Sequence, residues 1–187
     1  IQIPDEHLNP LENNTIETLA TFYIKQIQLI QNEGTYYLGG YSFGGVVAYE
    51  MAQQLFQLGQ VVENLLMIDT PSYITLPALN PDDTDILVYL LDVGVNHKVS
   101  EHFYALSYEE KLKYFLQYMR NMQDVGEDAS VRQIKTYLDI YKENLQAMTV
   151  YRPTAYLHKS AIHFIKAMGS DEINAVNPEE GWLKLAD

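Results

Sequence analysis

Residues Gly40–Tyr41–Ser42–Phe43–Gly44 read G-Y-S-F-G, and Gly45 follows directly. The G-x-S-x-G pattern is typical of a nucleophile elbow, a sharp turn from a strand into a helix with serine at its apex. Small residues are needed on both sides of the serine because the turn brings backbone segments close together. The pattern makes Ser42 a candidate nucleophile.

The flanking residues favour this interpretation. Residues 35–38 (T-Y-Y-L) are aromatic and β-branched, as in a strand. Residues 44–58 carry apolar side chains at helical spacing, and Gly59 is a natural helix stop. Strand, elbow and helix thus follow in the required order. The alternative is a glycine-rich turn in which the serine is structural.

A second candidate, Asp69, ends the next apolar run, Val61–Ile68 (V-V-E-N-L-L-M-I), which is typical of a buried parallel strand. The helix over 44–58 runs ~22 Å and this strand returns ~23 Å, so we expect Asp69 at the same sheet edge as Ser42, one or two strands away. An aspartate there can accept the Nδ1–H of a histidine. The order Ser, Asp, His is that of α/β-hydrolases. The alternative is an Asp that caps the turn at Thr70–Pro71.

Helices and strands alternate around these motifs. Asn14 and Glu17 resemble a capping box, and a helix with apolar residues up to Ile30 should end near Gly34. Residues 161–167 return to strand character, and a last helix should start near 179–182. This alternation predicts an α/β fold with a mainly parallel sheet flanked by helices.

The region between these elements is helical throughout. Apolar faces predict three helices, over residues 86–91, 108–122 and 131–148. Three helices inserted after a sheet strand are most simply a lid. We therefore expect one domain over 1–187, with core residues 1–70 and 150–187 and a lid insertion over about 72–149.

No histidine in the chain is a convincing base. The five histidines are scattered, without a spacing typical of metal sites: His7, His97, His102, His158 and His163. His158 precedes the strand at 161–167 and His163 lies inside it, so neither easily reaches the edge that carries Ser42. The other three are expected to be solvated residues.

Composition excludes several classes of protein. The chain has 187 residues, is 47% hydrophobic, contains no cysteine and carries a net charge of −13. It is globular rather than disordered, it cannot form disulfides or thiolate metal sites, and its charge argues against nucleic-acid binding. No apolar run approaches a membrane span and no signal peptide opens the chain, so we expect a cytoplasmic protein without membrane association.

Several stretches resemble the type I thioesterase domains that end non-ribosomal peptide synthetases and polyketide synthases. The most specific is Y-L-G-G-Y-S-F-G-G-V-V-A-Y-E-M-A at residues 37–52. The others lie at residues 16–20, 23–24, 65–71, 151–153, 162–167 and 181–182. The insertion resembles the family's lid only in being helical.

The resemblance implies an α/β-hydrolase fold in which Ser42 is the nucleophile and Asp69 the acid. The backbone N–H of Phe43 would be one oxyanion-hole donor. The catalytic histidine maps beyond Asp187, and the loop with the second donor maps before Ile1, so we expect a domain truncated at both ends. Aromatic residues of the insertion could line an acyl pocket, or could instead pack between its helices: Tyr89, Phe103, Tyr104, Tyr108, Tyr114, Phe115 and Tyr118.

The function implied is release of an acyl or peptidyl chain, by hydrolysis or cyclisation, through an acyl-enzyme on Ser42. The substrate would be carried on the phosphopantetheine arm of a carrier protein, the expected partner, with no bound cofactor or metal. One alternative is a general α/β-hydrolase esterase; another is a catalytically incomplete interaction module. Without base and second donor, we expect the isolated 187-residue chain to show little or no turnover.

Overall fold

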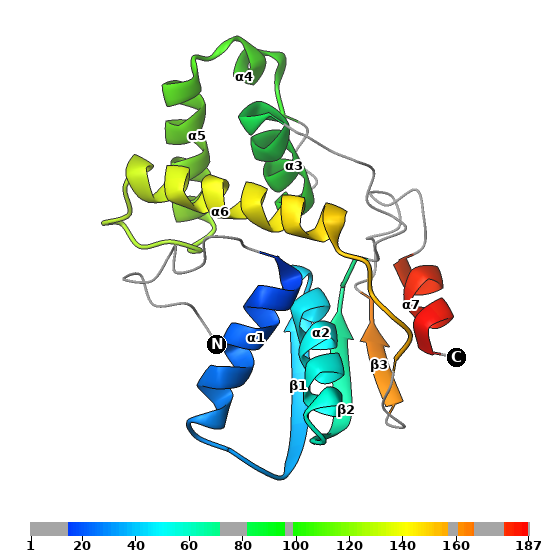
Figure 1. Ribbon diagram of the computed structural model, residues 1–187. Helices are drawn as coiled ribbons and strands as arrows, with labels where there is room; N and C mark the ends of the chain where they lie inside the picture. Colours follow the sequence, from blue (N-terminus) through cyan, green and yellow to red (C-terminus); the bar gives the residue numbers. More distant parts are fainter. Residues whose placement is uncertain (1–14, 72–81, 96–98, 157–160, 167–177, 187) are drawn as a thin grey trace. The chain divides into compact units, whose positions relative to one another are not determined.

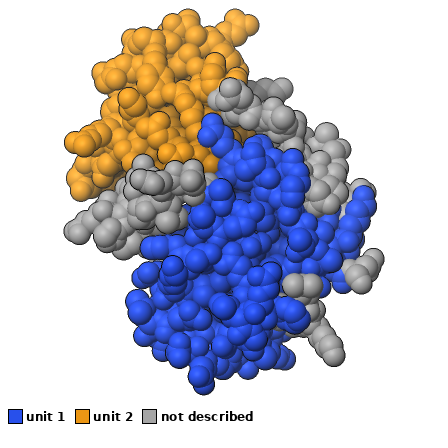
Figure 2. Space-filling view, viewed as in Figure 1, with its two compact units in different colours: residues 1–78, 146–187 blue, residues 79–145 orange. Residues whose placement is uncertain are grey.

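The computed structural model of the protein describes residues 15–71, 82–95, 99–156, 161–166 and 178–186 (Figure 1). Its elements follow in the order α1 (Ile16–Gln28), β1 (Thr35–Tyr41), α2 (Phe43–Gln57), β2 (Val61–Ile68), α3 (Asp83–Val95), α4 (Glu101–Ala105), α5 (Tyr108–Asn121), α6 (Val131–Val150), β3 (Ala161–Ile165) and α7 (Pro178–Ala186). The chain forms two compact units, residues 1–78 with 146–187 and residues 79–145 (Figure 2).

The first unit is built on a parallel sheet with strand order β1-β2-β3. Tyr41 pairs with Ile68, and Ile68 pairs with Ile165, so the three strands end at one edge. Helix α2 connects β1 to β2 and packs against both, and α1 packs against α2 (Figure 1). This alternation of helices with parallel strands confirms the predicted α/β class.

The core of this unit comes from apolar residues at helical and strand spacing. Its buried side chains in α1, β1, α2 and β2 are Ile16, Leu19, Ala20, Ile24, Tyr36, Val46, Val47, Ala48, Tyr49, Met51, Ala52, Leu55, Val62, Leu65 and Met67. Gly45 and Gln53 of α2 are buried as well. Helix α2 therefore lies inside the unit, which gives the residue at its start a rigid support.

The second unit is helical. Its core consists of Ile86, Leu87, Leu91, Phe103, Leu112, Phe115, Leu116, Ile134 and Leu138. Phe103 and Phe115 thus pack between helices, the second of the two roles considered for the insertion's aromatics, whereas Tyr89 and Tyr104 are exposed. The sequence predicted three helices; α4 is an additional one, too short at five residues to show a periodic pattern.

Several predicted boundaries were wrong, among them the end of β3, which lies at Ile165 rather than at residue 167. Helix α1 is capped by Thr15, in a box with Thr18, rather than by Asn14 with Glu17. It ends at Gln28, and Ile30, expected on its apolar face, is 93% exposed. Strand β1 extends beyond the predicted 35–38 to Tyr41, because its glycines pair with β2.

Within the described part of the chain, no helix is both long and apolar enough to cross a membrane.

Candidate active site

Ser42 occupies a strained turn between β1 and α2. Its backbone has φ 49° and ψ −121°, in the left-handed half of conformational space that non-glycine residues rarely adopt. Its N–H donates to the carbonyl of Ile68 at 2.8 Å, which ties the turn to the end of β2. Its hydroxyl makes no capping hydrogen bond to α2. This is the geometry of a nucleophile elbow.

Two glycines allow the turn to close. A Cβ on Gly40 would overlap the backbone of Gly44, and a Cβ on Gly45 would overlap the hydroxyl of Thr70. At Gly44, by contrast, a Cβ would meet nothing within 4 Å. The requirement for small residues therefore applies to Gly40 and Gly45, and at Gly45 it comes from the chain that follows β2.

Asp69 is the first residue after β2, as Ser42 is the first after β1. Because Tyr41 pairs with Ile68, the two residues follow neighbouring strands at one edge, where strands lie about 4.8 Å apart. Asp69 also has a left-handed backbone, with φ 44°, and its N–H donates to the carbonyl of Ile165 at 2.8 Å. The strand that carries Asp69 is thus directly next to the strand that carries Ser42. Its role as the acid stays a prediction.

Thr70, the residue after Asp69, is fully buried and forms hydrogen bonds through both its hydroxyl and its carbonyl. The Thr70 hydroxyl donates to the carbonyl of Ile68 at 3.3 Å. The indole N–H of Trp182, on α7, donates to the Thr70 carbonyl at 3.2 Å. The Trp182 ring lies 4.9 Å, centroid to centroid, from the ring of Tyr49 on α2. The sequence singled out residues 181–182 only as a family likeness and did not predict this contact.

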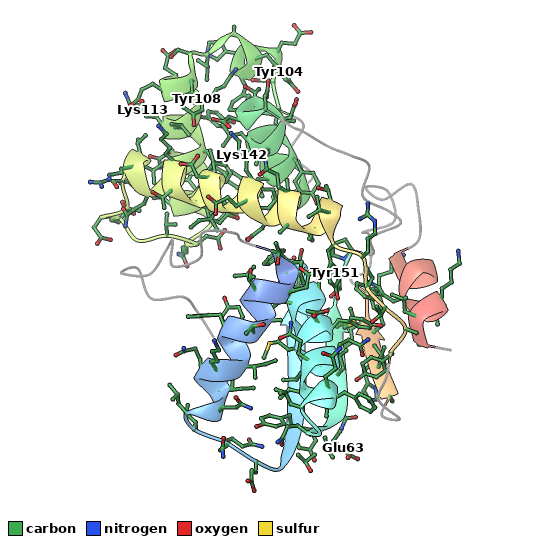
Figure 3. All side chains as sticks on the ribbon, in the orientation of Figure 1. Glu63, Tyr104, Tyr108, Lys113, Lys142 and Tyr151 are labelled. Carbon is green, nitrogen blue, oxygen red and sulfur yellow. The ribbon has the colours of Figure 1, made fainter. Side chains whose placement is uncertain are left out.

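The polar face of α2 holds the segment that follows α6. Tyr151 donates from its hydroxyl to Oε2 of Glu50 at 2.8 Å (Figure 3 labels Tyr151). Gln53 donates to the carbonyl of Ala155 at 2.7 Å, and Tyr49 donates to the carbonyl of Thr154 at 2.7 Å. Burial, followed by the nearby Glu50 carboxylate, raises the pKa of Tyr151 well above its ordinary value of 10.0. This phenol is therefore a neutral hydrogen-bond donor. The sequence singled out residues 151–153 only as a family likeness and did not predict this hydrogen bond.

The N-terminus of α2 supplies backbone donors beside Ser42. Phe43 is the first residue of the helix, and helix geometry leaves the N–H of such a residue without a partner in the helix. The first turn carries no acidic side chain, so nothing there offsets the positive end of the helix dipole. Phe43 therefore remains a suitable oxyanion-hole donor.

Two of the five histidines lie in the part of the chain that the structure describes. His163 lies in the middle of β3, and its Nε2 is 2.9 Å from Oδ1 of Asn64. His102 lies in α4, in the second unit. His7, His97 and His158 lie outside the described residues. In the described ranges, no three His, Asp or Glu side chains gather closely enough to hold a metal ion.

The family model for the thioesterase domain matches residues 1–172. The chain belongs to the thioesterase domain family. Its predicted family and fold class are thereby confirmed. Among curated proteins, it is 49% identical over 74 residues to the non-reducing polyketide synthase PKS16 of Cladonia grayi, and 50% identical over 56 residues to the polyketide synthase PksR of Bacillus subtilis (strain 168). These matches cover 39% and 30% of the chain, and 4% and 2% of those synthases.

Solved structures agree with the assignment. A four-domain nonribosomal peptide synthetase, holo-AB3403 bound to AMP and glycine, superposes on 94% of the thioesterase chain with a TM-score of 0.76 and 30% identity, over 14% of its own length. The NocB thioesterase domain, in a covalent complex with a fluorophosphonate nocardicin G analog, superposes on 81% of the chain and 54% of its own length, with a TM-score of 0.54 and 24% identity. The second likeness concerns the fold alone.

Proposed function

We propose that this thioesterase domain releases acyl or peptidyl chains from the phosphopantetheine arm of a carrier protein. The observation that carries the proposal is the strained elbow at Ser42, with Asp69 on the neighbouring strand at the same edge. The likeness to polyketide and nonribosomal peptide synthases supports a substrate carried as a thioester. The carrier protein is the expected partner.

In the proposed reaction, the Ser42 hydroxyl oxygen attacks the thioester carbonyl carbon and gives its proton to a histidine base. The Phe43 N–H donates to the oxyanion that forms. The C–S bond then breaks, the thiol leaves with the proton, and an ester remains on Ser42. Water releases the chain as an acid, or a nucleophile of the chain itself closes a ring. Asp69 holds the histidine in the required tautomer and stabilises its cation.

The base is not assigned to either histidine of the described residues. The Nε2 of His163 lies 2.9 Å from Oδ1 of Asn64 in mid-strand, and His102 is an exposed residue of the short helix α4. We assign the helical insertion over about residues 72–149 as the lid, because in sequence it begins just after the Asp69 segment and ends just before Tyr151.

Covalent labelling tests the proposal. The full-length protein is treated with a fluorophosphonate, and the modified peptide is identified by mass spectrometry. We expect modification of Ser42, and none in the Ser42→Ala variant, while Gly44→Ala, a neighbour with open space around it, is labelled like the parent. An unlabelled Ser42 in folded protein would contradict the proposal.

A general esterase is the second candidate, since nucleophile elbows of this kind also occur in lipases and esterases. Turnover of octanoyl-pantetheine is compared with that of p-nitrophenyl octanoate in the same protein. Preference for the pantetheine thioester in kcat/KM supports the carrier-linked function. Preference for the oxyester favours the esterase.

A further inference from the structure

The residue after Asp69 is held by a side chain that lies far away in the sequence. Trp182 donates its indole N–H to the carbonyl of Thr70, a residue 112 positions earlier. We propose that Trp182 is a positioning residue, which fixes the backbone from which the Asp69 carboxylate acts on the catalytic histidine. The inference rests on the proposed role of Asp69 as the acid.

Asp69 needs such support because its own backbone is strained. A non-glycine residue at φ 44° stays there only when neighbouring contacts hold it. Two of these contacts come from the sheet: the Asp69 N–H donates to the Ile165 carbonyl, and the Thr70 hydroxyl donates to the Ile68 carbonyl. The third contact comes from the Trp182 indole N–H, which restrains the carbonyl of Thr70.

Trp182 is itself firmly placed. Trp182 is 3% exposed, and its ring packs on the ring of Tyr49, with 4.9 Å between the two centroids. Tyr49 lies on α2, the helix that begins directly after Ser42. The Trp182 indole therefore contacts both α2, which follows Ser42, and Thr70, which follows Asp69. A catalytic triad requires a fixed distance between these two parts of the site.

A buried indole N–H also needs an acceptor for purely structural reasons. The two roles differ in what the loss of the N–H changes. A positioning role predicts a loss of kcat that depends on the Asp69 carboxylate, because a displaced acid orients the base poorly. A structural role predicts a loss of stability without such dependence.

A double-mutant cycle on the full-length protein separates these roles. Trp182 is replaced by β-(3-benzothienyl)alanine, which keeps the shape of the ring but lacks the N–H, in the parent and in the Asp69→Asn background. Kinetics are measured with octanoyl-pantetheine. Tyr49→Phe is the matched control, since it removes one buried hydrogen bond of the same cluster away from the acid turn.

We expect the analogue to lower kcat about five- to tenfold in the parent, the effect of one lost hydrogen bond, with KM unchanged within twofold. Asp69→Asn alone should lower kcat by about 10⁴-fold, and adding the analogue should then change kcat less than twofold. Tyr49→Phe should lower Tm without the loss of kcat.

Two results would overturn the inference alone: an unchanged kcat in the analogue protein, or an equal loss of kcat in both backgrounds. If Asp69→Asn leaves kcat intact, the acid assignment fails first and the inference fails with it. Trp182→Phe provides a second variant if the analogue protein does not fold, and the same dependence on Asp69 is expected of it.

Discussion

Replacing Gly45 by alanine tests whether the elbow and the acid turn are packed as one unit. The added Cβ would overlap the Thr70 hydroxyl and lie 2.9 Å from both Cβ and Cγ2 of that residue. Thr70 cannot easily move away, because it is fully buried, bonded through its hydroxyl to Ile68 and through its carbonyl to Trp182. For ordinary van der Waals contact, the added Cβ and the two Thr70 carbon atoms would have to move apart by about half an ångström or more, and the Thr70 hydroxyl would have to move further.

The cost follows from these contacts. Overpacking of this kind costs about 1–3 kcal/mol, and loss of the Thr70–Ile68 hydrogen bond adds about 1 kcal/mol. Alanine in place of a helical glycine returns about 0.5–1 kcal/mol. We therefore expect Gly45→Ala to lower the free energy of unfolding by about 1–3 kcal/mol. Gly44→Ala, with no atom within 4 Å of its Cβ, should raise it by up to about 1 kcal/mol.

The assay is urea denaturation of the two variants and the parent, followed by circular dichroism. A further variant, Gly45→Ala with Thr70→Ala, removes the overlapping hydroxyl and should be more stable than the sum of its single changes predicts. Equal free energies of unfolding for Gly44→Ala and Gly45→Ala, within about 0.5 kcal/mol, would refute the packing argument.

Two further predictions concern Tyr151 and His163. Tyr151→Phe leaves Glu50 without the donor at 2.8 Å and should lower the free energy of unfolding by about 1–3 kcal/mol in urea titrations. Burial raises the pKa of Tyr151, so its contribution is complete below about pH 10 and falls progressively as the pH rises above that value. The parent should therefore lose stability more steeply than Tyr151→Phe in this alkaline range, and equal slopes would contradict this account. His163→Ala removes a contact with Asn64 and should keep kcat for octanoyl-pantetheine within twofold; a loss of several orders of magnitude would instead identify His163 as the base.

The local parts of the site could be predicted because each depends on neighbours in sequence. The glycines around Ser42 specify the tight turn, and the apolar run before Asp69 specifies a buried strand. The matching lengths of helix and strand predicted the common edge, which the register confirms. The N-terminal boundary of α1 was wrong because Asn14 and Thr15 are both good caps, and local propensity does not decide between adjacent candidates.

By itself, the sequence determined the α/β class, the elbow and the edge that Ser42 and Asp69 share. Only the tertiary structure decided what supports them: Trp182 against Thr70, and Tyr151 against Glu50, residues 112 and 101 positions apart. The physical reason is that each contact satisfies a buried polar group, the indole N–H of Trp182 or the hydroxyl of Tyr151. Each group must find a partner wherever packing brings one, and no spacing along the chain encodes that choice.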